Sequence, residues 1–156
     1  MIILGISAYH GDSAAVIIVN GNVIAAIEEE RLNRVKHWAG FPIESISYCL
    51  DAAKVDISEV DYISINRDPK AAFFKKILFL LRNKVPFSFI KDRLKNKKSI
   101  ESVGQILAEK FDANADALQK KVKYVEHHIS HLASSYYMSS FKNSDLISID
   151  GTGDWT

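Results

Sequence analysis

The stretch Ala14-Ala-Val-Ile-Ile-Val-Asn-Gly-Asn-Val-Ile-Ala-Ala-Ile27 decides the fold of this chain. Its two apolar runs, rich in β-branched residues, are typical of strands. Asn20 and Gly21 lie between them, and Asn-Gly is a strong hairpin signal because both residues of the tight turn need positive φ. The apolar run from Ile2 to Ile6 adds a strand before the hairpin. Three consecutive antiparallel strands are therefore predicted to open the fold.

The rest of the chain alternates between helical and strand patterns. Pro42 starts a helix predicted to reach about Ala53, and its inner face carries Ile43, Ile46, Leu50 and Ala53. Further strands are predicted at residues 62–65, 123–125 and 144–150, and residues 69–121 read as a helical insertion. This order predicts an α/β protein with a mixed sheet flanked by helices, the ribonuclease-H-like layout.

Composition and charge narrow the class of protein. The chain is 47% hydrophobic and 25% charged with a net charge of +1, so it is not an obvious nucleic-acid or membrane binder. Residues 67–98 nevertheless carry eleven Lys or Arg against two acids. We interpret this excess as the solvated face of an added helix pair; contact with a polyanion or a membrane surface is the alternative. The longest apolar stretch is too short and too charged to span a bilayer.

The cysteine and the N-terminus indicate a compartment. Cys49 is the single cysteine, which excludes an internal disulfide and suits a reducing environment. Its apolar surroundings predict a packed helix residue rather than a nucleophile. No basic start followed by an apolar run and a cleavage site is visible, so we expect no secretory signal and a cytoplasmic protein.

Three of the five histidines lie within five positions, in His127-His-Ile-Ser-His131. The residues Ile129, Leu132, Ala133, Tyr136 and Tyr137 repeat with helical period, which predicts a helix beginning near His127. His127 and His131 then lie one turn apart, close enough to hold one metal ion. The positive helix end disfavours imidazolium and keeps the rings neutral, as metal ligands require.

Two histidines alone make a weak site, so further ligands must come from elsewhere. The pair suits iron, zinc and other divalent metals. His128 is three residues before His131 and could replace His127 in the pair. Spacing alone does not choose between them.

Two polar stretches are candidates for anion binding. Arg31, Arg34, Lys36 and His37 follow the third strand and could converge on an anion, although a solvated loop explains them equally well. The second stretch is Asp150-Gly-Thr-Gly-Asp154, where small residues would let backbone N–H groups approach a phosphate and an aspartate could hold a divalent cation. An ordinary turn is the alternative for this stretch.

Five segments taken together resemble one family. They are Gly5-Ile-Ser-Ala-Tyr-His-Gly-Asp-Ser-Ala-Ala15, Glu29-Glu-Arg31 with Arg34-x-Lys36-His37, Phe41-Pro42, His127-His-x-x-His131 and Ile149-Asp-Gly-Thr-Gly-Asp154. In this order they resemble the N-terminal domain of the nodulation and cephamycin type O-carbamoyltransferases, across the whole chain except the insertion. The resemblance implies that residues 1–156 are the N-terminal part of a domain of the sugar kinase, Hsp70 and actin superfamily, with the remainder of the polypeptide outside this sequence.

The resemblance also implies an activity. Family members join this domain to a region that makes carbamoyl adenylate from carbamoyl phosphate and ATP, and they move the carbamoyl group onto a hydroxyl of a small molecule or glycan. The implied cofactors are a divalent metal, iron or zinc, and ATP or carbamoyl adenylate. Nucleic acid is not an expected partner. The chain by itself is expected to be inactive, because the adenylate-forming region and a remaining metal ligand are absent from it.

Residue roles follow from the same resemblance. His10 would be the general base at the acceptor hydroxyl, and His127 and His131 would bind the metal together with an acidic residue beyond Thr156. The nucleotide would meet Lys36, Asp150, Gly151, Thr152 and Gly153. The scheme is chemically coherent, because an imidazole that accepts the hydroxyl proton speeds attack while a metal polarises the carbamoyl oxygen.

Three other functions fit parts of the sequence. A tRNA threonylcarbamoyl transferase would share the fold and the paired histidines, and the basic insertion would suit tRNA. A phosphotransferase of the same superfamily leaves the histidines unexplained. The third alternative is a non-catalytic regulatory or scaffold domain that keeps the fold but has lost the catalytic activity.

Overall fold

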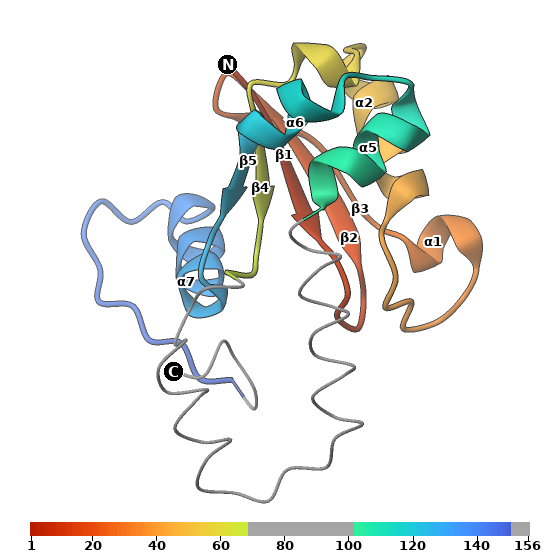
Figure 1. The fold of residues 1–156 in the computed structure, drawn as a ribbon. Coiled ribbons are helices and arrows are strands. Elements are labelled where there is room, and N and C mark those ends of the chain that lie inside the picture. Colours follow the sequence, from red (N-terminus) through yellow and green to blue (C-terminus); the bar gives the residue numbers. More distant parts are fainter. Residues whose placement is uncertain (69–101, 151–156) are drawn as a thin grey trace, which may run out of the picture.

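The computed structural model describes residues 1–68 and 102–150. Within them, five strands form one mixed sheet in the order β3-β2-β1-β4-β5 (Figure 1). The strands are β1 (Ile2–Ser7), β2 (Ala14–Val19), β3 (Asn22–Glu28), β4 (Tyr62–Ile65) and β5 (Val122–Tyr124). β1 pairs with β2 and β2 with β3 in antiparallel fashion, whereas β4 and β5 continue the sheet in parallel. This is the ribonuclease-H-like layout that the sequence predicts.

The hairpin between β2 and β3 is confirmed. Asn20 has a φ of 50° and Gly21 a φ of 84°, so both turn residues adopt the positive values that an Asn-Gly hairpin requires. Val19 and Asn22 pair directly across the turn. The register that follows places Ala15 and Ile17 on the buried face of the sheet.

Helices cover the two faces of the sheet unequally. They are α1 (Glu30–Asn33), α2 (Ile43–Ala53), the short 3-10 helix η1 (Ile57–Glu59), α5 (Val103–Phe111), α6 (Ala115–Lys121) and α7 (His127–Tyr137). α2, α5 and α6 share one hydrophobic core with the sheet, through residues such as Ile46, Leu107 and Leu118. α7 lies apart from them, next to β4 and β5 (Figure 1).

The start of α2 is capped by a carboxylate from another part of the chain. Pro42 occupies the N-cap position and makes no side-chain cap. Glu29 is 3% exposed, and its two oxygens accept hydrogen bonds from the backbone N–H groups of Ser45 at 2.7 Å and Glu44 at 3.1 Å. Because the first N–H groups of a helix lack partners within it, Glu29 supplies acceptors that the local sequence does not. The predicted inner face is confirmed at Ile46 and Leu50, which are buried.

One predicted strand is wrong. Residues 144–150 have no regular secondary structure, and Ile147 and Ile149 are 83% and 92% exposed. Their apolar pattern shows that the segment has strand propensity, but a strand also needs a neighbour with free backbone groups. No described strand lies alongside this segment in the sheet.

The insertion is described only at its end. The described part of the insertion, residues 102–121, contains two helices as predicted, α5 and α6. The helix predicted around residues 74–81 and almost all of the basic residues between 67 and 98 lie outside the described residues. Within the described part of the chain, no helix is long and apolar enough to cross a membrane.

Candidate metal centre

α7 begins where the sequence predicts, at His127. Glu126 is the N-cap, and its carboxylate accepts a hydrogen bond from the backbone N–H of Ile129 at 2.9 Å. Desolvation raises the pKa of Glu126, but hydrogen bonds from the N–H groups of Ile129 and His128 and the nearby histidine charges outweigh it, so the pKa is lowered. An ionised cap therefore fixes the first turn, which carries His127 and His128.

His127 and His131 face each other and meet a carboxylate. Their Nε2 atoms are 3.1 Å apart, and Oδ2 of Asp150 lies 2.6 Å from His127 Nε2 and 3.6 Å from His131 Nε2. The three donor atoms therefore lie within one small group. The side chain of His127 is only 14% exposed, whereas those of Asp150 and His131 are 31% and 55% exposed, so the group is partly shielded and open on one side.

The donor set fits a divalent cation. Two imidazole nitrogens and a carboxylate oxygen are the ligands that zinc and non-haem iron accept. Ligands about 2.1 Å from a tetrahedral ion lie about 3.4 Å from each other, close to the separations of 3.1 and 3.6 Å here. The contact of 2.6 Å between His127 and Asp150 would have to lengthen. An ion would then find three ligands and still have a position open for a substrate.

Asp150 was missed as a partner of the histidines. The sequence places it in a nucleotide turn, and the resemblance implies a third metal ligand beyond Thr156. Asp150 is 23 residues from His127, and no periodic pattern connects residues so far apart. The signal that the sequence did give was the stretch Asp150-Gly-Thr-Gly-Asp154, in which an aspartate could hold a divalent cation.

His128 does not join this group. Its Nδ1 lies 3.1 Å from the hydroxyl of Ser148, and its ring is perpendicular to that of His127. Neighbouring residues of a helix point about 100° apart, so His127 and His128 cannot both face Asp150. The structure thus pairs His131 with His127, the choice that spacing left open.

His10 lies beside the centre. Its ring centroid is 6.0 Å from that of His127, although the two residues are far apart in sequence. The turn that carries it is tied to residues 38–40, since Ser13 donates its backbone N–H to Trp38 O and its hydroxyl to Gly40 O at 2.8 Å. Ser13 is fully buried, so this tie is shielded from water. A fixed turn therefore holds an exposed imidazole next to the candidate metal ligands.

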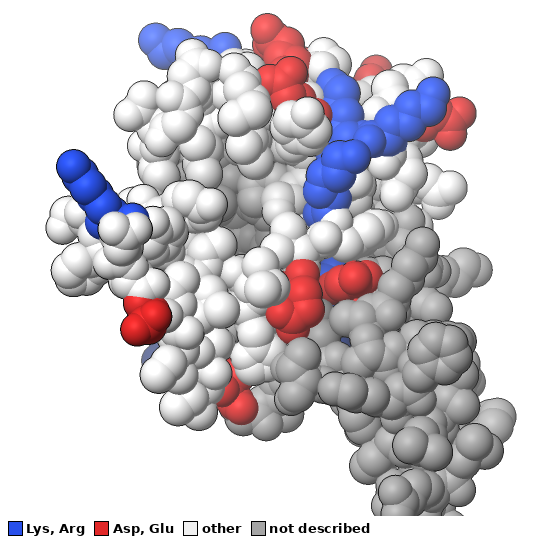
Figure 2. Space-filling view, turned by 90° about the vertical axis from the view of Figure 1, so that its left-hand side faces the viewer, with Lys and Arg blue, Asp and Glu red and all other residues white. Residues whose placement is uncertain are grey.

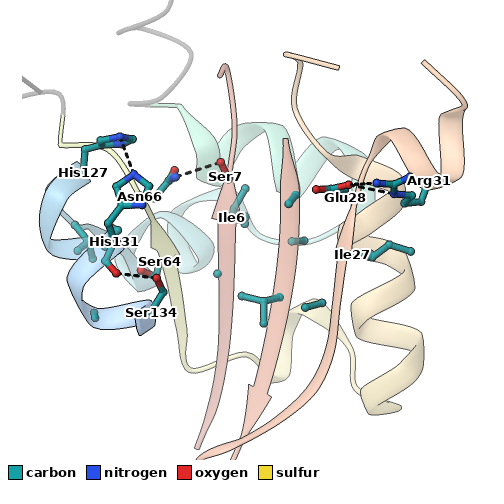
Figure 3. Close-up of a pocket in the computed structure, with 18 residues that line it drawn as sticks. Ile6, Ser7, Ile27, Glu28, Arg31, Ser64, Asn66, His127, His131 and Ser134 are labelled. Carbon is teal, nitrogen blue, oxygen red and sulfur yellow. Dashed lines mark hydrogen bonds and ion pairs between the residues drawn. The ribbon is translucent and has the colours of Figure 1, made fainter. Parts of the chain in front are cut away.

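A cleft of about 740 Å³ opens from the two histidines across the sheet. Figure 3 shows His127 and His131 on one wall, Glu28 and Arg31 on the opposite wall, and Ser7 and Asn66 between them. The amide of Asn66 donates to the Ser7 hydroxyl at 3.1 Å, which joins the ends of β1 and β4. On the face of the molecule drawn in Figure 2, most described residues are uncharged, with separate acidic and basic residues among them. Such a cleft can hold a ligand beside the histidines.

The basic residues after β3 do not converge on an anion site. Arg31 forms ion pairs with Glu28 at 2.8 Å and Glu30 at 3.4 Å, and its charge is thereby offset. His37 instead pairs with Asp12 at 2.8 Å. Lys36 is exposed and does not line the cleft. The other predicted nucleotide contacts, Gly151, Thr152 and Gly153, lie outside the described residues.

Cys49 is a core residue. It is fully buried in α2, and burial raises the pKa of its thiol to about 11. A thiol with so high a pKa stays protonated near neutral pH and is a poor nucleophile. The structure therefore agrees with the packing role that the sequence predicts for it.

Comparisons with known proteins point to one family. Residues 2–156 match the family described as Carbamoyltransferase N-terminus. An uncharacterized protein of Synechocystis is 38% identical over 98% of this chain and 26% of its own length. Nodulation protein NolNO of Sinorhizobium fredii is 39% identical over 92% of this chain and 20% of its own length. The chain thus spans about a quarter or less of these relatives.

A comparison of structures gives a more distant match. YeaZ from Pseudomonas aeruginosa aligns with a TM-score of 0.42 and 17% sequence identity, over 87% of this chain and 47% of YeaZ.

Proposed function

Because this chain belongs to the carbamoyltransferase N-terminus family, we propose that it carries the site where a carbamoyl group passes from carbamoyl adenylate to a hydroxyl acceptor. The observation that carries the proposal is the convergence of His10, His127, His131 and Asp150, two of which, His127 and His131, line a cleft. The donor would be made from carbamoyl phosphate and ATP by a region outside this chain. The acceptor would be a small molecule or a glycan.

His127, His131 and Asp150 would hold a divalent metal, iron or zinc. Bound there, the ion would polarise the carbamoyl oxygen, on which negative charge develops during attack. The protein's own part is to hold three donor atoms on a helix turn and an adjoining segment, with one side of the group open to the cleft.

His10 would be the general base. Its Nδ1 lies 3.3 Å from Gly11 O, which leaves Nε2 to accept the proton of the acceptor hydroxyl. As the acceptor oxygen bonds to the carbamoyl carbon, the bond from that carbon to the phosphate oxygen breaks and AMP leaves with the electron pair. The product is a carbamate ester, and the proton remains on His10 until water removes it.

The residues that we propose to bind the nucleotide are assigned from the sequence resemblance. Lys36 would neutralise charge on the adenylate phosphate, and the turn from Asp150 to Gly153 would offer backbone N–H groups to it. Asp150 would then bind the metal with its side chain, and it would also be the first residue of the nucleotide-binding turn.

The test is transfer of radiolabelled carbamoyl from carbamoyl phosphate to a hydroxyl acceptor, with ATP and the adenylate-forming region present. His127→Ala or His131→Ala should abolish transfer without changing the circular dichroism spectrum. His10→Ala should lower turnover by about 10²-fold or more and still bind Zn²⁺. Glu109→Ala, at an exposed position of α5, is the control. Full activity in either metal-ligand variant would refute the metal role, and loss of Zn²⁺ in His10→Ala would reassign that residue.

A further inference from the structure

The side chain of His128 has no role in the proposed reaction, and its contact is specific. Its Nδ1 faces the Ser148 hydroxyl at 3.1 Å. It stands edge-on to His127, with ring centroids 5.8 Å apart and an interplanar angle of 90°. The adjacent histidines therefore point in different directions, one toward Asp150 and the other toward Ser148.

The segment that carries Ser148 and Asp150 contacts α7 at its start as well, where the Tyr136 hydroxyl donates to Lys142 O at 2.9 Å. Residues 141–150 form no regular secondary structure, and Ser148 is the one residue among them that is not exposed. The apolar side chains of Ile147 and Ile149 point into solvent and contribute little by burial. Hydrogen bonds from the first turn of α7 to Ser148 and Asp150 join this segment to the helix.

We propose that His128 and Ser148 form a latch that positions Asp150 for metal binding. The inference rests on the metal centre of the proposed function and assigns a role to a residue outside the ligand set. Ser148 is two residues before Asp150, so fixing one restricts the other. A carboxylate that is already in place binds an ion without losing conformational entropy at that moment, whereas a free segment has to be ordered first. His128 and Ser148 are thus positioning residues, and the ligands remain His127, His131 and Asp150.

The helix geometry explains why two adjacent histidines are useful here. Successive residues of an α-helix are rotated by about 100°, so His127 can face the ion while His128 reaches the incoming segment. Both lie in the turn fixed by the Glu126 cap. Because both histidines lie in one rigid turn, the metal ligand His127 and the latch residue His128 keep a fixed orientation relative to each other.

The latch is tested by Zn²⁺ titration of the 156-residue chain, followed by calorimetry. His131→Ala identifies the binding event of the centre, because Asp12, Glu30 and His37 form a second group of possible ligands. We expect His128→Ala and Ser148→Ala each to weaken binding by about 10-fold or more, the range for residues that orient metal ligands. The double variant should lose no more than either single variant, since both remove the same contact. Ser144→Ala, the same change at an exposed position of the same segment, should bind as the wild type does.

Two further measurements distinguish a loss of Asp150 positioning from a general loss of stability. The unfolding midpoints of His128→Ala and Ser148→Ala without metal should match the wild type, because the latch holds an exposed segment. With Co²⁺ as the probe, the visible spectrum of His128→Ala should move toward that of Asp150→Ala. Unchanged Zn²⁺ affinity in both variants, with the wild type binding well, would overturn the latch alone. A wild-type chain that binds no Zn²⁺ would overturn the metal centre and the latch together.

Discussion

Replacing Glu29 tests whether a distant carboxylate caps α2. The side chain is almost fully buried, and it accepts hydrogen bonds from the backbone N–H groups of Ser45 and Glu44. Hydrogen bonds to a charged group contribute about 1.5–3 kcal/mol each. Glu29→Ala removes both bonds and leaves two N–H groups at the start of the helix without an acceptor. We expect it to lower the free energy of unfolding by about 3 kcal/mol or more.

Glu29→Gln separates the number of bonds from the size of the side chain. Glutamine keeps one acceptor oxygen but turns an NH₂ group toward the second backbone N–H. Its expected loss is about half that of Glu29→Ala, or about 1.5 kcal/mol. At about 2–4 °C per kcal/mol for a domain of this size, the melting temperature should fall by about 6–12 °C for alanine and 3–6 °C for glutamine.

Urea unfolding followed by far-ultraviolet circular dichroism measures these differences. Glu109→Ala removes an exposed glutamate from α5 and should change the free energy of unfolding by less than about 0.5 kcal/mol. If Glu29→Ala unfolded at the same urea concentration as this control, the capping role would be refuted. If glutamine cost as much as alanine, the charge of Glu29 rather than its two acceptor oxygens would be the stabilising feature.

Two further predictions concern titratable groups. Asp12, through its hydrogen bond and then its charge, raises the pKa of His37, so this contact stabilises the fold below the ordinary histidine pKa of about 6.5, and the gain is lost as pH rises through the raised value. In an NMR titration, Asp12→Asn should return the His37 pKa toward its ordinary value, and an unchanged pKa would contradict the pairing. Cys49 should react with a disulfide reagent near pH 8 only as fast as the chain unfolds, because its thiol is buried and its pKa is about 11. Rapid labelling of the native chain would show that it is accessible.

Much of the fold could be predicted because it depends on neighbours in sequence. The Asn20-Gly21 turn fixes the first hairpin through the φ angles that these two residues tolerate. The change from strand to helix at His127 was visible in the spacing of apolar residues, and the helix begins at that residue. The same spacing put His127 and His131 one helical turn apart, but it left His128 as an alternative to His127, and only the structure shows His128 turned toward Ser148.

The burial of these elements was less predictable. The sequence predicts an apolar face on α7, yet none of its residues is buried, and Tyr137 is 80% exposed. Periodicity reports that a helix is amphipathic and does not report what packs against it. The predicted strand at residues 144–150 fails for a related reason, since a strand exists only where a neighbour accepts its hydrogen bonds.

The sequence by itself determined the five strands of the described sheet, the turn, the histidine helix and a set of candidate metal ligands that included His127 and His131, because each depends on residues within one or two helical turns. Only the tertiary structure brought Asp150 to the histidines, turned His128 toward Ser148, and placed His10 within 6.0 Å of the His127 ring. It also gave Glu29 its place at the start of α2. These contacts join segments that are far apart in the chain. Their geometry is set by how the sheet and helices pack, which no local pattern records.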